Sequence, residues 1–171
     1  SDYPLRDVYK RQTPHHPFHA RLLAAGVAAD DLARLAGAPC PPDILGIDHY
    51  LTSDRFLDTD LARHPPATHG GNGRDIYADT AAYHEPALLP DLGFRARLCE
   101  VHARTGLTLA ITEAHAACTR EGQVRWLCEA WAAAEAARGE GVPVVAVTSW
   151  ALFGSVDWNS LLTREAGHYE S

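Results

Sequence analysis

The chain has 171 residues, none of them methionine, and its 15 Lys and Arg against 22 Asp and Glu give a formal net charge of −7. This length suffices for one ordinary domain with a buried core, and 46% hydrophobic with 22% charged residues excludes wholesale disorder. The acidic balance argues against a nucleic acid or an anionic membrane as partner, because both need a basic face. No apolar run reaches the about 18 residues of a membrane span, and the polar start is unlike a signal peptide.

The ends of the chain lead to two expectations. Because a cytosolic protein starts with Met, we expect this chain to begin downstream of its own start, or to have been processed or cut. Residues 1–12 show neither helical nor strand periodicity and are interpreted as a tail or a foreign junction, which leaves 13–171 as the domain. Within 13–36, short amphipathic patterns predict helix, interrupted at Gly26 and stopped by Gly37 and Pro39.

The cysteines indicate the redox compartment. None of the four belongs to a C-x-x-C pair, and scattered cysteines in a chain of this length are typical of free thiols in a reducing, cytoplasmic compartment. A disulfide or a metal role is the alternative. The four residues are Cys40, Cys99, Cys118 and Cys128.

Three short apolar runs predict buried strands, at residues 44–47, 107–111 and 142–147. Helices are predicted between them, near 89–104 with a stop at Gly106 and at 120–138 with Thr119 as N-cap. The order strand, helix, strand, helix, strand predicts parallel strands with right-handed connections. The polar segment 51–88 between the first strand and the first of these helices is too long for an ordinary connection and is interpreted as a functional loop.

Chemistry-bearing residues follow each predicted strand. Asp48, His49 and Tyr50 follow the first, Glu113 the second, and the segment 150–158 the third. The carboxyl ends of parallel strands share one edge of a sheet, so these groups should converge on one pocket. A carboxylate beside a tyrosine hydroxyl and flat tryptophan walls suits a carbohydrate. No glycine-rich phosphate loop follows any strand, and we expect no bound cofactor and no metal.

These segments resemble the C-terminal part of family 1 glycoside hydrolases, the β-glucosidase-like (β/α)8 barrels. D-I-L-G-I-D-H-Y at 43–50 resembles that family's D-F-[IL]-G-[IL]-N-Y-Y strand, and I-T-E at 111–113 resembles its I-T-E-N-G nucleophile strand. W-A-L-F-G-S-V-D-W at 150–158 resembles its W-S-L-L-D-N-F-E-W segment. The resemblance covers about residues 41–160. It implies an α/β fold made of about strands 6–8 of a TIM barrel, incomplete in this chain.

The resemblance also implies roles for single residues in a retaining β-glycosidase. Glu113 would be the catalytic nucleophile, and Tyr50 would hydrogen-bond it. The remaining matched positions would bind the small-molecule β-glycoside; they are Asp48, His49, His115, Trp150, Asp157 and Trp158. The departures are Ala114-His115 in place of Asn-Gly, Asp48 in place of Asn and Asp157 in place of Glu, a pattern closer to divergent bacterial domains sometimes linked to a dTDP-4-dehydrorhamnose-reductase-like domain.

The second catalytic group is expected outside the chain. A retaining glycosidase needs two carboxyl groups about 5–5.5 Å apart, and the family's acid/base motif N-E-P would precede residue 1. His84-Glu85-Pro86 imitates that motif, but no apolar strand precedes it, and we interpret it as a coincidence. Two other hypotheses remain open: a non-catalytic carbohydrate or sugar-nucleotide binding domain accompanying the reductase-like domain, and a metal-dependent hydrolase.

Overall fold

The computed structural model describes residues 15, 18–38, 40–160 and 163–170, so the predicted tail at 1–12 lies outside the described residues. Its helices are α2 (His19–Ala24), α3 (Ala29–Gly37), α4 (Gly93–Thr105) and α5 (Arg120–Gly139). Its strands are β1 (Ile44–Tyr50), β2 (Arg55–Asp58), β3 (His69–Gly71), β4 (Ile76–Ala81), β5 (Thr108–His115), β6 (Val144–Ser149), β7 (Ser155–Val156) and β8 (Tyr169–Glu170).

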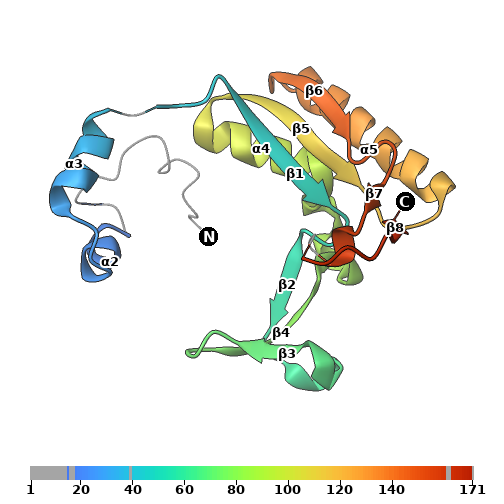
Figure 1. Ribbon diagram of the computed structural model, residues 1–171, viewed down its shortest axis with the longest axis horizontal. Coiled ribbons are helices and arrows are strands. Elements are labelled where there is room, and N and C mark those ends of the chain that lie inside the picture. Colours follow the sequence, from blue (N-terminus) through green and yellow to red (C-terminus); the bar gives the residue numbers. More distant parts are fainter. Residues whose placement is uncertain (1–14, 16–17, 39, 161–162, 171) are drawn as a thin grey trace.

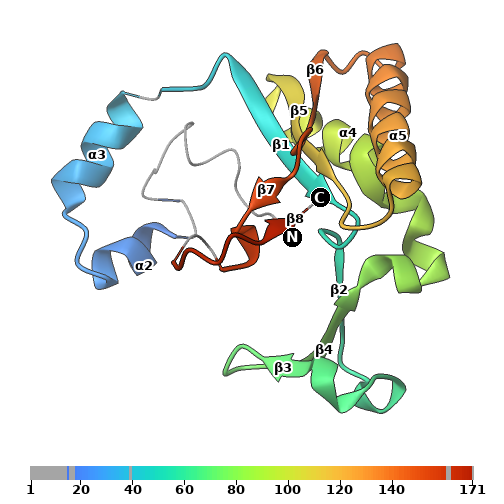
Figure 2. The same ribbon diagram turned by 45° about the vertical axis from the view of Figure 1, so that its right-hand side comes forward.

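The three predicted strands form one parallel sheet in the order β1-β5-β6 (Figure 1). Each strand continues for two to four residues past its apolar run, because the polar residues that follow still pair with the neighbouring strand; Tyr50, for example, lies opposite His115. The connection from β1 to β5 includes β2, β3 and β4 and ends in α4, whereas α5 alone connects β5 to β6. Both helices lie on the same side of the sheet (Figure 2). The predicted parallel βαβαβ order is confirmed.

The expected TIM-barrel portion is wrong. The structure is a small mixed α/β fold with a three-stranded parallel sheet and a separate antiparallel sheet, and no further barrel strand occurs among the described residues. In that part of the chain β1 and β6 each pair with β5 alone, so the parallel sheet is open at both edges. The physical reason is that alternating strands and helices along the chain specify parallel pairing, which open sheets and closed barrels share.

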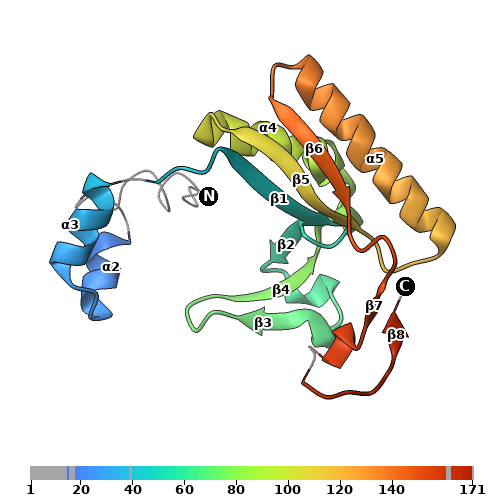
Figure 3. The same ribbon diagram turned by 45° about the horizontal axis from the view of Figure 1, so that its top comes forward.

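The segment 51–88 is not a structureless loop. β2, β4 and β3 form an antiparallel sheet in that order, which extends away from the parallel sheet (Figure 3). Four short 3-10 helices accompany it, at Leu61–Arg63, Pro66–Thr68, Ala82–His84 and Pro86–Asp91, and a fifth occurs at Trp158–Ser160. Strands of three to six residues are too short to show clearly the alternating pattern that identifies a strand in sequence, and β3 and β4 also contain glycines or alanines.

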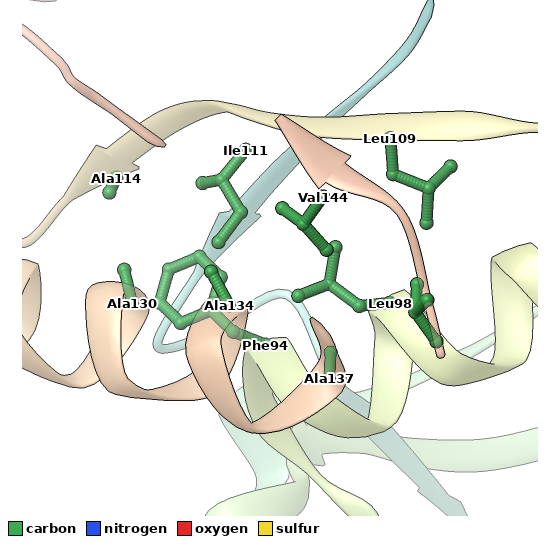
Figure 4. Packing of buried hydrophobic residues seen from close by; sticks show 10 residues of the cluster. Phe94, Leu98, Leu109, Ile111, Ala114, Ala130, Ala134, Ala137 and Val144 are labelled. Carbon is green, nitrogen blue, oxygen red and sulfur yellow. The ribbon is translucent and has the colours of Figure 1, made fainter. Parts of the chain in front are cut away.

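The core lies between the parallel sheet and its two helices. Leu98 of α4 and Leu109 and Ile111 of β5 are fully buried there, and the alanine-rich face of α5 packs closely over them (Figure 4). Two predicted helix ends are confirmed. The Thr119 hydroxyl accepts a hydrogen bond from the Gly122 amide at 3.3 Å, and Gly106 ends α4 in the left-handed region at φ +70°.

Other expectations concern tryptophan, cysteine and the membrane. Trp126 of α5 packs against the core, whereas Trp131 of the same helix is 57% exposed. All four cysteines are free thiols, as predicted. No helix in the described part of the chain is long and apolar enough to cross a bilayer.

Candidate functional site

The carboxyl end of the parallel sheet brings Asp48, Tyr50 and Glu113 together on the face that α4 and α5 do not cover. Asp48 and Glu113 lie directly opposite each other on β1 and β5. The register shifts between Ile47 and Asp48, where Thr112 is the extra residue of β5. Such a bulge redirects side chains next to it. Here the side chains of both Thr112 and Glu113 form hydrogen bonds with residues of β1. The Thr112 hydroxyl donates to Asp48 Oδ1 at 2.7 Å.

Glycine at position 46 is what lets Thr112 approach β1. A Cβ at Gly46 would lie 2.8 Å from both Oγ1 and Cγ2 of Thr112. Threonine is β-branched and has little rotamer freedom with which to yield. Because Gly46 has no side chain, β1 leaves the space that Thr112 needs to form its hydrogen bond with Asp48.

The hydroxyl of Tyr50 donates a hydrogen bond to Oε2 of Glu113. Burial first, and then the hydrogen bond to Glu113 and the charges of Glu113 and Asp48, raise the pKa of Tyr50 to about 12. The phenol therefore keeps its proton at neutral pH and acts as a donor that holds the carboxylate. This is the pairing that the resemblance implied for these two residues.

A cavity of about 370 Å³ lies beside this pair. Its lining residues come from the ends of β1, β5 and β6 and from the segment after β6; they are Tyr50, His115, Ala117, Trp150, Ala151, Gly154, Ser155 and Trp158. The indole rings of Trp150 and Trp158 meet edge to face, with centroids 5.8 Å apart and planes at 66°. Glu113 does not line the cavity itself, but it is hydrogen-bonded to Tyr50, which does. The other four lining residues were not among the predicted site residues; they are Ala117, Ala151, Gly154 and Ser155.

His49 lies on the opposite side of the sheet from this cluster. Alternation along β1 turns it toward the helices, where it is 4% exposed and contacts the rings of Phe94 and Trp126, with centroids 4.9 and 6.3 Å away. Its Nε2 lies 3.7 Å from Asp54 Oδ2. Burial, partly opposed by Asp54, lowers the pKa of His49. The structure therefore gives His49 a packing position rather than one beside Glu113.

We expect this buried imidazole to make the fold less stable in mild acid. Its pKa lies below that of an unfolded histidine, near 6.5, so the unfolded chain binds the proton more readily. Stability from His49 is then fully present above about pH 6.5 and lost as the pH falls through the lowered folded pKa. The melting temperature should fall by several degrees between about pH 7.5 and pH 5.5.

His49→Gln should show a clearly smaller fall over the same range than the unchanged chain, whereas His84→Gln, at an exposed histidine, should behave like the unchanged chain. Asp58 and Asp157 do not interfere, because hydrogen bonds lower their pKa values from 3.8 and their loss comes at more acidic pH. Equal pH dependence in all three proteins would contradict the assignment.

Asp157 is also directed away from the cavity. Its carboxylate accepts hydrogen bonds from the backbone amides of Ala166, Gly167 and His168 at 2.8–2.9 Å, and it is 5% exposed. These three hydrogen bonds lower its pKa. Asp157 thus fastens the segment 163–170 to the turn after β7, which accounts for a buried carboxylate without a substrate.

The structure also shows where the H-E-P sequence at 84–86 lies and which side chains could approach a metal ion. Glu85 of the H-E-P sequence lies beside the antiparallel sheet, where its carboxylate meets Arg63 at 3.4 Å. Within the described ranges no group of three or more His, Cys, Asp or Glu side chains is placed to hold a metal ion.

Comparisons with known proteins give likeness to solved structures but no family. No protein-family model matches the sequence, and no curated protein matches it. The structure is similar to the crystal structure of the AHE enzyme from Alicyclobacillus herbarius, with a TM-score of 0.48 and 19% sequence identity over 78% of this chain and 33% of that chain. The chain thus spans about a third of the length of that enzyme chain. At this level of similarity the match identifies neither family nor activity.

Proposed function

We propose that this chain carries the nucleophile half of a retaining β-glycosidase site, with Glu113 as nucleophile and a small-molecule β-glycoside as substrate. The observation that supports this most directly is the hydrogen bond from Tyr50 to Glu113 at the rim of a tryptophan-lined cavity. The proposal rests on side chains at the end of an open parallel sheet and does not require a closed barrel.

The chemistry of the cluster suits this reaction. Tyr50 remains protonated and holds one oxygen of Glu113; no described residue hydrogen-bonds the other oxygen, which is available to attack an anomeric carbon. Activation of a carboxylate nucleophile by such positioning is a general feature of covalent catalysis. A cavity of about 370 Å³ falls at the small end of ligand pockets, about 300–1,000 Å³. The apolar faces of Trp150 and Trp158 suit the C–H face of a sugar ring.

A binding function without turnover is the second candidate. One observation favours it: among the described residues no carboxylate lines the cavity, whereas retaining enzymes ordinarily use two. The chain would then hold a carbohydrate or a sugar nucleotide for another domain, such as the reductase-like domain that the resemblance suggests. Both candidates agree with free thiols in a reducing compartment, and we propose a cytoplasmic location on that ground.

Covalent trapping separates the two candidates. The full chain is incubated with a 2-deoxy-2-fluoro β-glycoside carrying a good leaving group, and the labelled peptide is mapped by mass spectrometry. We expect the label on Glu113, and slower labelling of Tyr50→Phe because the carboxylate loses its holding donor. Glu129→Gln, at an exposed glutamate of α5, should be labelled at the unchanged rate.

Label on another residue with activity intact would refute Glu113 as nucleophile. Saturable binding of the sugar with no label would favour the binding function.

A further inference from the structure

Asp48 adds a second carboxylate beside Glu113 on the open face of the parallel sheet. The two residues lie directly opposite each other in the pairing of β1 with β5, and neighbouring strands are about 4.8 Å apart. His49 is buried on the helix side, so alternation along β1 directs Asp48 and Tyr50 to the other face. The charges of Glu113 and Asp48 both help to raise the pKa of Tyr50, whose side chain lines the cavity. Both carboxylates therefore act at the rim of this cavity.

The carboxylate of Asp48 is held through one of its two oxygens. Its Oδ1 accepts the hydrogen bond from the Thr112 hydroxyl at 2.7 Å, and Gly46 provides the space for that contact. No described residue hydrogen-bonds Oδ2. Glu113 is held in the same way, through its Oε2 by Tyr50. Each of the two carboxylates thus keeps one oxygen that can accept a hydrogen bond from a bound molecule.

The protein supplies no counter-charge for this pair. In the described part of the chain neither Asp48 nor Glu113 forms an ion pair, whereas Glu140, for example, meets Arg95 at 2.6 Å. The described wall of the 370 Å³ cavity contains no Lys or Arg, and Arg120 lines a separate cavity of about 230 Å³ beside α5. Ionised carboxylates only accept hydrogen bonds, and their strongest partners are cationic donors. The site therefore favours a ligand that carries a positive charge and N–H donors.

We infer that Asp48 makes this site selective for an amino sugar, with a 2-amino-2-deoxy β-glycoside as substrate; this inference rests on the proposed function. Glu113 attacks the anomeric carbon, C1, and the substituent on the adjacent ring carbon, C2, lies within reach of a carboxylate one strand away. An ammonium group at C2 donates to Oδ2 of Asp48, and its charge offsets that of the carboxylate pair. A hydroxyl at C2 makes only a weaker hydrogen bond there.

Calorimetric titration tests the selectivity without requiring turnover. The full chain is titrated with methyl 2-amino-2-deoxy-β-D-glucoside and with methyl β-D-glucoside at about pH 6.5, where the amine is largely protonated. We expect the amino glycoside to bind about 10- to 100-fold more tightly. Asp48→Asn keeps the shape of the side chain and still accepts from Thr112, so it should fold, but its preference should drop below about threefold. Asp43→Asn, at an exposed aspartate directly before β1, should keep the full preference.

The outcomes separate this inference from the proposed function. Equal affinity of the unchanged chain for the two sugars, or an undiminished preference in Asp48→Asn, would refute Asp48 as the selecting group. Covalent labelling of Glu113 would still stand in that case, because the 2-fluoro label has no donor for Asp48 and reports on the nucleophile alone. Failure of both sugars to bind, together with no labelling of Glu113, would refute the proposed function and this inference with it.

Discussion

Replacement of Glu113 by glutamine is expected to lower kcat/KM for a β-glycoside by at least about 10⁴-fold. The amide has the shape of the carboxylate and still accepts a hydrogen bond from Tyr50, so the fold should persist. It cannot form a glycosyl ester, however, and the covalent route is closed. Release of dinitrophenolate from a 2,4-dinitrophenyl β-glycoside by the full chain measures the effect, because that leaving group needs no proton donor.

Two measurements make this result decisive. Glu129→Gln, at an exposed position on α5, should retain full activity, and the melting temperature of Glu113→Gln should match that of the unchanged chain. Added azide should not restore formation of the product with the natural anomeric configuration by Glu113→Gln, because the group that the variant has lost is the nucleophile. A variant that keeps more than about a tenth of the activity would contradict the assignment.

Replacement of Leu98 by alanine is expected to lower the free energy of unfolding by about 2–5 kcal/mol. Leu98 is 0% exposed and lies between α4 and the parallel sheet, where it belongs to the same buried cluster as Leu109 and Ile111 (Figure 4). Truncation removes buried methyl groups and leaves a cavity that two helices and a sheet cannot fill by collapse. Urea denaturation followed by circular dichroism measures the change.

Leu152→Ala is the matched control. The same atoms are removed there from a side chain that is 73% exposed, and the expected change is within about 0.5 kcal/mol. Similar midpoints for the two variants would show that the sheet and helices do not form the stable core described above.

Local pattern predicted the elements of the parallel sheet well. Continuous apolar runs identified all three strands, and capping chemistry identified Thr119 and Gly106 as helix ends, since both signals depend on neighbouring residues alone. The start of α4 was less accurate. Pro90 has no amide hydrogen to donate, and the segment before Gly93 is a 3-10 helix at Pro86–Asp91 instead.

Whether the parallel sheet closes into a barrel could not be predicted from the sequence pattern. Parallel pairing of neighbours follows from short-range order, whereas closure depends on whether the outermost strands meet, which no local run of residues encodes. β2, β3 and β4 escaped notice for a related reason. They are held by pairing with one another across up to 26 residues, from Arg55 to Ala81, and with three to six residues each they are too short to show a clear two-residue period.

For this protein, the sequence by itself determined which groups stand at the ends of the strands and that the strands run parallel. The tertiary structure decided on which face of the sheet, and against which neighbours, each of those groups lies. The bulge at Thr112 and strand alternation place Tyr50, Glu113 and His115 on one face, turn His49 into the aromatic core, and leave Asp157 bound to backbone amides. The reason is physical: one residue of register reverses the side of the sheet on which a side chain lies, and register is set by pairing between distant strands.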